Sequence, residues 1–164
     1  IHAQQGNTDD ADSSFERALE LNDSDAVLHN DYGYFCYLQK DFKQATEHLN
    51  RAVSIAPDYA AAHNNLAMAL ACSGKSQEAQ EHFRLAGCSP AQSLSNLAYA
   101  RLMQRDFSQA KQYLNEALIV DPNQEQAKAA LATLERIEAG GNSIAANKRA
   151  ATKTSMSSYS RDRY

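Results

Sequence analysis

Small and large apolar residues recur every three or four positions along most of the 164-residue chain. Between residues 42 and 55, for example, Ala45, Leu49, Ala52, Val53 and Ile55 follow this spacing. Such a period places the apolar side chains on one face of an α-helix. The pattern predicts eight helices, near residues 8–21, 27–39, 42–55, 60–72, 76–86, 91–104, 108–119 and 124–138.

Residues that begin or end helices stand between these segments. Asp41, Ser76 and Asp106 are predicted N-caps, because their side-chain oxygens can accept hydrogen bonds from free backbone N–H groups. The three prolines, at positions 57, 90 and 122, lie at predicted helix ends, where proline neither removes a helical hydrogen bond nor clashes with the preceding turn. The chain is therefore predicted to be a series of helices joined by short turns.

The apolar pattern itself repeats. A triplet of small, large and small residues recurs after shifts of 34, 34 and 31 residues: Ala11, Phe15, Ala18; Ala45, Leu49, Ala52; Ala79, Phe83, Ala86; and Ala110, Leu114, Ala117. The same shifts relate Gly33, Ala67 and Ala98, which we expect where two helices approach most closely. A hairpin of two such helices cannot bury its apolar face alone, so the repeat predicts hairpins stacked side by side.

At these residues the chain resembles the tetratricopeptide repeat family in its bacterial form. Tyr32-Gly33, Leu66-Ala67 and Leu97-Ala98 match the first-helix part of that family's 34-residue motif, and the triplets with their closing prolines match the second. The resemblance implies an all-α, right-handed α-solenoid of helix-turn-helix repeats, about three and a half repeats plus a C-terminal capping helix. The expected units are a half repeat at 1–25, repeats at 26–59, 60–90 and 91–123, a capping helix at 124–139 and a tail at 140–164.

The chain departs from the family pattern in three ways. Cys36 and Arg101 stand where the first helix usually has an aromatic residue, and the unit at 60–90 is three residues short. The chain also opens inside a unit, with only its second helix, so we expect it to belong to a longer array.

The charge distribution bears on the class of partner. The whole chain has a net charge of −4, but residues 1–139 carry 11 Lys/Arg against 19 Asp/Glu, whereas residues 140–164 carry five against one. An acidic body repels phosphate backbones, so nucleic acid is not an expected partner. The longest uninterrupted apolar run, residues 66–72, is far shorter than the roughly 20 residues that span a bilayer, so we expect no transmembrane segment.

No residue pattern indicates catalysis, a cofactor or a metal. The five histidines lack metal-ligand spacing, and His29, His63 and His48, His82 occupy equivalent places in successive units, which indicates shared packing. Cys36 and Cys72 lie in apolar stretches and are expected to be buried thiols, while Cys88, in a turn, is a candidate reactive thiol. Phosphate-cradling glycine loops and nucleophile elbows are missing from the sequence. The chain is predicted not to be an enzyme.

Polar residues inside the first helices of the repeats are more informative, because asparagine is a poor mid-helix residue. The resemblance implies that first helices line a concave surface, where such asparagines bond the backbone of an extended peptide. Tyrosine and methionine follow one or two turns further along the same face. The candidate binding residues are Asn30, Asp31, Tyr34, Tyr37, Asn64, Asn65, Met68, Asn96, Tyr99 and Met103, named the inner strip below. The alternative is that they only join neighbouring helices.

We therefore expect a protein–protein interaction scaffold that binds a peptide or partner protein in a concave groove. Chaperone-binding relatives hold a terminal carboxylate with a basic clamp, but the corresponding sites here lack Lys and Arg: Val27, Asn30, Tyr34, Asn65, Gln92 and Asn96. The short third unit, with Ser-Pro-Ala and then Ser-Asn-Leu-Ala-Tyr-Ala at 89–100, resembles the tight-adherence pilus assembly lipoproteins. The alternative function is an accessory domain of a larger enzyme whose catalytic part lies outside this chain.

The basic segment 140–164 is predicted to dock on the acidic body, within one chain or between two, through residues 144–156. In this hypothesis Ile144 or Met156 contacts the inner strip and Lys148 or Arg149 pairs with Asp31. Self-association through this segment would follow if docking occurs between chains. Localisation stays open: three cysteines without a disulfide pattern favour a reducing compartment, whereas the pilus resemblance would imply the periplasm.

Overall fold

The computed structural model describes the backbone of residues 2–139 and the side chains from Asp9 onward; residues 1 and 140–164 lie outside the described part. The predicted docking of residues 144–156 falls on this undescribed segment. Within the described residues every regular element is a helix. The helices are α1 (His2–Leu21), α2 (Ala26–Leu38), α3 (Phe42–Ile55), α4 (Ala60–Cys72), α5 (Ser76–Leu85), α6 (Pro90–Met103), α7 (Phe107–Val120) and a last helix over residues 125–139.

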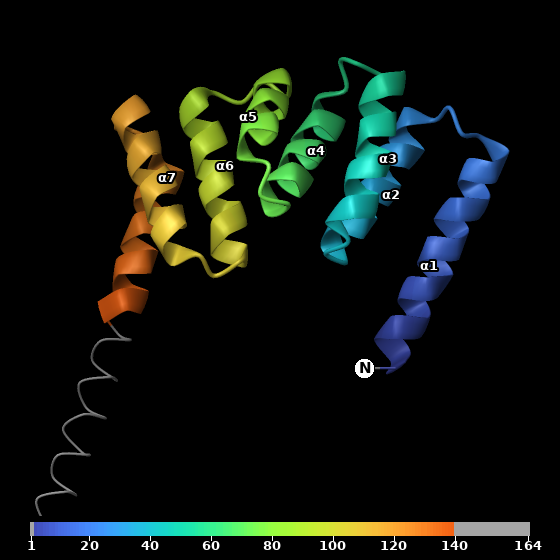
Figure 1. Ribbon diagram of the computed structural model, residues 1–164, viewed down its shortest axis with the longest axis horizontal. Coiled ribbons are helices and arrows are strands. Elements are labelled where there is room, and N and C mark those ends of the chain that lie inside the picture. Colours follow the sequence, from blue (N-terminus) through green and yellow to red (C-terminus); the bar gives the residue numbers. More distant parts are fainter. Residues whose placement is uncertain (1, 140–164) are drawn as a thin grey trace, which may run out of the picture.

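The helices form an all-α, right-handed solenoid of stacked hairpins that curves into an arc (Figure 1). α2 packs on α3, α4 on α5 and α6 on α7, and the hairpins join through α3 with α4 and α5 with α6. The first helices of the hairpins also touch in succession, α2 with α4 and α4 with α6, whereas α3, α5 and α7 make no comparable contacts with one another. The first helices therefore lie on the inside of the curve.

Predicted and observed helix bounds agree within two residues, except that α1 begins at His2 instead of near residue 8. Asp41 and Asp106 are N-caps as predicted, accepting from the backbone N–H of Gln44 and Gln109. The prediction for Ser76 is wrong: α5 already begins there, and its N-cap is Lys75. The Ser76 hydroxyl instead accepts a hydrogen bond from Arg101 of α6 over 3.0 Å. A side chain that the local sequence predicts to be an N-cap therefore makes a tertiary contact.

The small residue of each first helix lies at a close approach of two helices. A Cβ atom added to Gly33 would lie 2.5 Å from Leu49 Cγ and 3.1 Å from the Ala45 carbonyl oxygen, so no larger residue fits without movement. Ala67 and Ala98, at the equivalent positions, are completely buried. The prediction is confirmed for Gly33, and full burial of the two alanines agrees with it.

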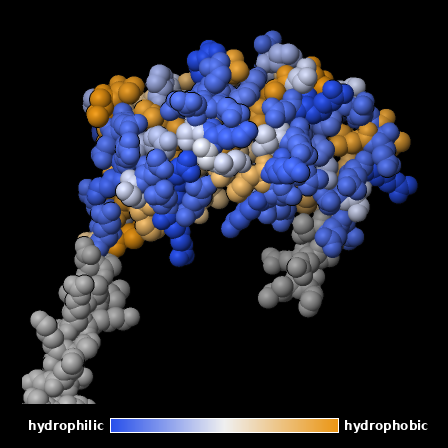
Figure 2. Space-filling view, viewed as in Figure 1, coloured by the Kyte–Doolittle hydropathy of each residue, from blue (hydrophilic) through white to orange (hydrophobic). Residues whose placement is uncertain are grey.

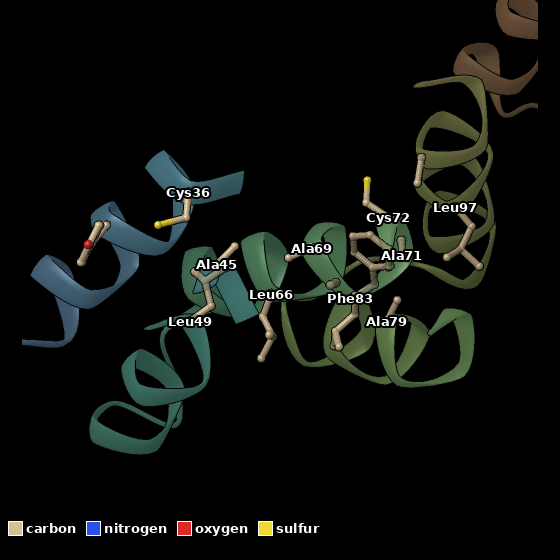
Figure 3. Close-up of a cluster of buried hydrophobic side chains, with 14 residues drawn as sticks. Cys36, Ala45, Leu49, Leu66, Ala69, Ala71, Cys72, Ala79, Phe83 and Leu97 are labelled. Carbon is tan, nitrogen blue, oxygen red and sulfur yellow. The ribbon is translucent and has the colours of Figure 1, made fainter. Parts of the chain in front are cut away.

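The core runs along the solenoid in two clusters. The larger joins buried residues of α2 to α6, among them Leu49, Leu66, Phe83 and Leu97 (Figure 3). The smaller joins α6, α7 and the last helix through Ala98, Leu114 and Leu134 and other buried residues. The face of the molecule seen in Figure 2 is mostly hydrophilic, with hydrophobic residues in separate patches. None of the described helices is both long and apolar enough to cross a membrane.

Candidate functional site

The inner strip comes from α2, α4 and α6, the three helices on the inside of the curve. Its residues differ in exposure. Tyr34, Tyr99 and Met103 expose 45%, 55% and 48% of their surface, which leaves them available for contact. Asp31 is also exposed, whereas Tyr37, Asn64, Asn65, Met68 and Asn96 are half-buried. Asn30 is buried.

Three polar residues of the strip form a hydrogen-bond chain between α4 and α2. The Asn65 amide Nδ2 donates to Asn30 Oδ1 over 2.9 Å, and Asn30 Nδ2 donates to Asp31 Oδ1 over 3.0 Å. Because Asn30 is only 5% exposed, its amide needs these partners to offset the cost of leaving water. The sequence left two roles open for Asn30 and Asn65, binding of a peptide and joining of neighbouring helices. The bond between them joins α4 to α2 and is of the second kind.

The asparagines of the strip are not equivalent. Asn96 of α6 has one weak contact, Nδ2 to the Cys88 sulfur at 4.0 Å. Within the part of the chain that the structure describes, Asn64, Tyr34 and Tyr99 make no side-chain hydrogen bond. The groups that remain for an incoming chain are therefore at Asn64, Asn96 and the two exposed tyrosines.

Tyr37 of α2 and Met103 of α6 meet across α4. The Tyr37 hydroxyl lies 3.6 Å from Met103 Sδ, although the residues are 66 positions apart, and the Tyr34 and Tyr37 rings stack with centroids 6.1 Å apart. Burial, followed by the nearby Cys72 and Tyr99, raises the pKa of Tyr37 to about 12, so its hydroxyl stays protonated and donates. These contacts make one continuous aromatic and thioether surface out of two distant helices.

A small cavity opens at the α6 end of this surface. It has a volume of about 250 Å³ and lies between α6 and the last helix. The lining comes from α6, α7 and the last helix: Ser95, Asn96, Tyr99, Leu102, Leu114, Gln126 and Ala130. Asn96 and Tyr99 belong to both the inner strip and the cavity, so the two features adjoin. None of the lining residues carries a charge, and Asp31 is the only charged residue of the strip.

Two histidine pairs, which sequence reasoning did not foresee, join the helices of the first two hairpins. His29 Nδ1 lies 3.1 Å from His48 Nδ1, and His63 Nδ1 lies 2.9 Å from His82 Nδ1. The Nε2 atoms of His29 and His63 lie 3.0 and 2.8 Å from the carbonyl oxygens of Asp23 and Pro57. The identical 19-residue spacing within each pair, repeated after 34 residues, was the available signal.

The geometry assigns the protons of each pair. A carbonyl oxygen can only accept, so the Nε2 of His29 carries the hydrogen, and its Nδ1 then accepts from the Nδ1–H of neutral His48. The same holds for His63 and His82. Burial, and then the neighbouring imidazole, lower the pKa values of His48 and His82. The pairs are therefore structural joints that hold an inter-hairpin loop to two helices.

A larger cavity, about 430 Å³, lies between α5 and α6 and was also missed. α5 has 10 residues, whereas α3 and α7 have 14, so α5 leaves part of the junction open. The cavity is lined by the ion pair of Arg84 and Glu81, and by Cys88, Leu94 and other side chains. The shortened 31-residue shift in the sequence marks this place. None of its lining residues belongs to the inner strip, although Cys88 also contacts Asn96 of the strip.

The thiols are poorly suited to nucleophilic chemistry. Cys36 and Cys72 are buried as predicted, and burial raises the pKa of Cys36 to about 12. Burial also raises the pKa of Cys88, which disfavours the reactive thiolate considered for this turn residue. The part of the chain covered by the structure contains no cluster of three or more His, Cys, Asp or Glu that could hold a metal ion.

Comparison with known protein families identifies the repeat. Two models, both described as tetratricopeptide repeat, match residues 1–25 and 23–86, which together span just over half of the chain. No curated protein sequence matches the chain significantly.

Solved structures with the same fold come from unrelated settings. PilF of Pseudomonas aeruginosa is 24% identical, with a TM-score of 0.53, covering 85% of this chain and 65% of its own. MamA is 15% identical, with a TM-score of 0.56, covering 84% and 82%. The APC/C hetero-tetramer Cut9–Hcn1 is 22% identical, with a TM-score of 0.53, covering 81% and 28%. The chain thus spans less than two thirds of the PilF and Cut9–Hcn1 chains, and these likenesses concern the fold.

Proposed function

Because the chain belongs to the tetratricopeptide repeat family, whose members generally mediate protein–protein interactions, we propose that it is a non-catalytic scaffold that binds a peptide or partner protein on its concave side. The observation that carries the proposal is the inner strip, where Tyr34 of α2 and Tyr99 and Met103 of α6 stay exposed. Tyrosine and methionine supply large, adaptable contact area at protein interfaces.

The asparagines support an extended segment as the bound form. An extended backbone has unpaired N–H and C=O groups, and each must find a partner when it leaves water. Asn64 and Asn96 present amides, which both donate and accept, on two successive first helices. Asn65 supports the surface indirectly, since its amide holds the buried Asn30 in place.

The finer setting we propose is assembly of a pilus or secretion machine. It is supported by the short unit at 60–90 and by the Ser-Asn-Leu-Ala-Tyr-Ala segment at 95–100, the features that resemble pilus assembly lipoproteins. The alternative, an accessory domain of a larger enzyme, predicts a catalytic domain elsewhere in the full-length protein, whereas the pilus proposal predicts a lipoprotein signal. Sequencing the complete gene distinguishes the two.

The groove is tested by comparing partner capture by the full chain and by two variants of it. In the first, Tyr34→Ala and Asn96→Ala remove one exposed and one half-buried side chain that make no strong internal hydrogen bond, so capture should fall at least tenfold while the melting temperature changes little. The matched control is Asn115→Ala, an exposed asparagine on α7. Equal capture by all three proteins would show that the partner does not use the concave side.

The pair Asn65→Ala and Asn96→Ala separates binding from joining. We expect weaker binding by a few kcal/mol or less, together with a modest loss of stability, because Asn30 loses its donor. If binding survives while the melting temperature falls sharply, the asparagines serve the fold alone.

The basic segment 140–164 is a second proposed occupant of the concave side. Its excess of positive charge over an acidic body favours weak docking, within the chain or between two copies, that salt would screen. The chain ending at residue 139 should then bind an external partner more tightly than the full chain at low salt, with the difference lost at high salt. Equal affinities at both salts would contradict docking.

A further inference from the structure

The cavity between α6 and the last helix has the size and chemistry of an anchor site within the proposed binding surface. Its floor is Leu114 of α7, which is 1% exposed, and Leu102 forms part of the wall. Ala130 faces α6 from the last helix, and its small side chain leaves the space open. At about 250 Å³ the cavity is below the usual range for a drug-sized ligand, which favours one inserted side chain over a free small molecule.

The lining excludes a charged occupant. Its polar groups are one hydroxyl at Ser95, two amides at Asn96 and Gln126, and the Tyr99 hydroxyl. Ser95 already donates to the Ala91 carbonyl oxygen. A carboxylate or ammonium group that entered would lose its water without meeting an opposite charge, which is strongly unfavourable. An apolar side chain instead covers the leucines and displaces water from apolar surface.

The mouth of the cavity is suited to a peptide backbone. Asn96 of α6 and Gln126 of the last helix both line the cavity, and each amide can both donate and accept. The Asn96 amide is held only by its 4.0 Å contact with the Cys88 sulfur, and Gln126 is exposed. Tyr99 connects the mouth to the rest of the inner strip.

Resting on the proposed function, we infer that this cavity binds one large apolar side chain, of the size of Leu, Ile, Met or Phe, from an extended peptide segment that carries no acidic residue. The segment continues from the cavity over Tyr99 and Met103 toward α2. There Asp31, the single charged residue of the strip, favours a neutral or basic residue of the segment. Anchor and charge preference together give the segment one direction along the groove.

The test begins with a display library of random 12-residue peptides selected on the full chain. Enriched peptides should share one large apolar residue at a fixed position and lack acidic residues around it. If no peptide is enriched, the proposed function fails and this inference with it. If peptides are enriched without a shared apolar residue, or with a shared acidic one, this inference alone is overturned.

A synthetic peptide of the enriched sequence then locates the anchor. Ala130→Leu fills the cavity and should weaken binding at least tenfold, whereas Ala132→Leu, an exposed alanine of the same helix, should not. Replacing the peptide's anchor residue by alanine should weaken binding to the parent protein at least tenfold as well. The same replacement should change binding to the Ala130→Leu variant very little. Equal affinity of Ala130→Leu and the parent protein would overturn the assignment.

A second variant covers the case in which Ala130→Leu disturbs folding. Gln126 is exposed, so Gln126→Glu should fold normally and place a carboxylate at the mouth. Binding of the peptide should weaken severalfold, while the isosteric change leaves the melting temperature unaltered. Unchanged binding would mean that the peptide lies elsewhere on the concave side, contrary to the inference.

Discussion

In the hairpins that begin with α2 and α4, an imidazole on the first helix meets an imidazole on the second, and a backbone carbonyl of the preceding loop completes the joint. In the hairpin that begins with α6, the shift of 31 residues puts Leu94 and Tyr113 at the same two positions. Both side chains are half-buried and pack against the smaller core cluster. The same two positions thus hold a hydrogen-bonded histidine pair in two hairpins and side chains packed against the core in the third.

The difference shows what each chemistry contributes. A hydrogen-bonded pair has direction, and it ties the loops at Asp23 and Pro57 to the helices that follow. Apolar side chains cannot donate a hydrogen bond to a loop carbonyl. The loop before α6 is instead held by local capping, since Ser89 and Gln92 form a complete capping box and Pro90 opens the helix. In two hairpins an imidazole of the first helix thus holds a loop carbonyl six residues earlier, whereas in the third a capping box holds the loop.

The largest expected effect comes from breaking a polar joint. His63→Ala leaves the Pro57 carbonyl and the Nδ1–H of His82 without their partner and opens a cavity, so the free energy of unfolding should fall by about 3 kcal/mol. Leu94→Ala at the apolar joint orphans no polar group and should cost about 1.5 kcal/mol. Urea unfolding of both variants measures the difference. Equal losses would mean that the hydrogen bonds add nothing.

A second comparison concerns the helix seam that all hairpins share. Ala67→Leu and Ala98→Leu each force three extra carbons into a completely buried position, and each should cost about 1–3 kcal/mol. Similar losses in thermal melts would show that the seam is common to hairpins whose joints differ. If Ala67→Leu melts like the parent protein, the argument from close approach is wrong.

Acid should separate the two kinds of joint. The pKa values of His48 and His82 lie below the ordinary 6.5, so the unfolded chain binds protons that the folded chain does not. The stability that depends on these two histidines being neutral is therefore fully present above about pH 6.5. It declines as the pH falls from there through their lowered pKa values in the folded chain. Nearby carboxylates oppose the shift, Glu47 and Asp12 at the first pair and Glu78 and Glu81 at the second, without reversing it.

Exchanging the joint tests this origin. His63→Leu together with His82→Tyr gives the second hairpin the pair found in the third, and should reduce the loss of melting temperature between pH 7 and pH 5. At pH 7 the exchange should cost about 1 kcal/mol, since the Pro57 carbonyl loses its donor. An undiminished acid sensitivity would assign the effect to other groups.

The smallest effect is expected at the exposed end of the solenoid. Glu125 pairs with Lys128 at 2.8 Å, but its side chain is 82% exposed, so Glu125→Ala should change stability by less than about 0.5 kcal/mol. A thermal melt that shows a clear loss would mean that the last helix depends on this pair, unlike the other ion pairs on exposed surface.

The amino-acid sequence by itself determined the helices and their stacking. The period of apolar residues, the caps at Asp41 and Asp106 and the 34-residue triplet are local or regularly repeated signals, so they can be read without knowing which helices touch. The same regularity indicated a close approach at Gly33, where a small residue recurs opposite a large one.

Only the tertiary structure decided which side chains meet across helices. Asn65 bonds Asn30 and not Asp31, which precedes it by one full repeat, and Tyr37 reaches Met103 over 66 residues. Such pairings depend on how far each helix is rotated and displaced against the next, by less than one helical turn. A sequence period does not specify that rotation, because it is set by the packing of all the buried side chains together.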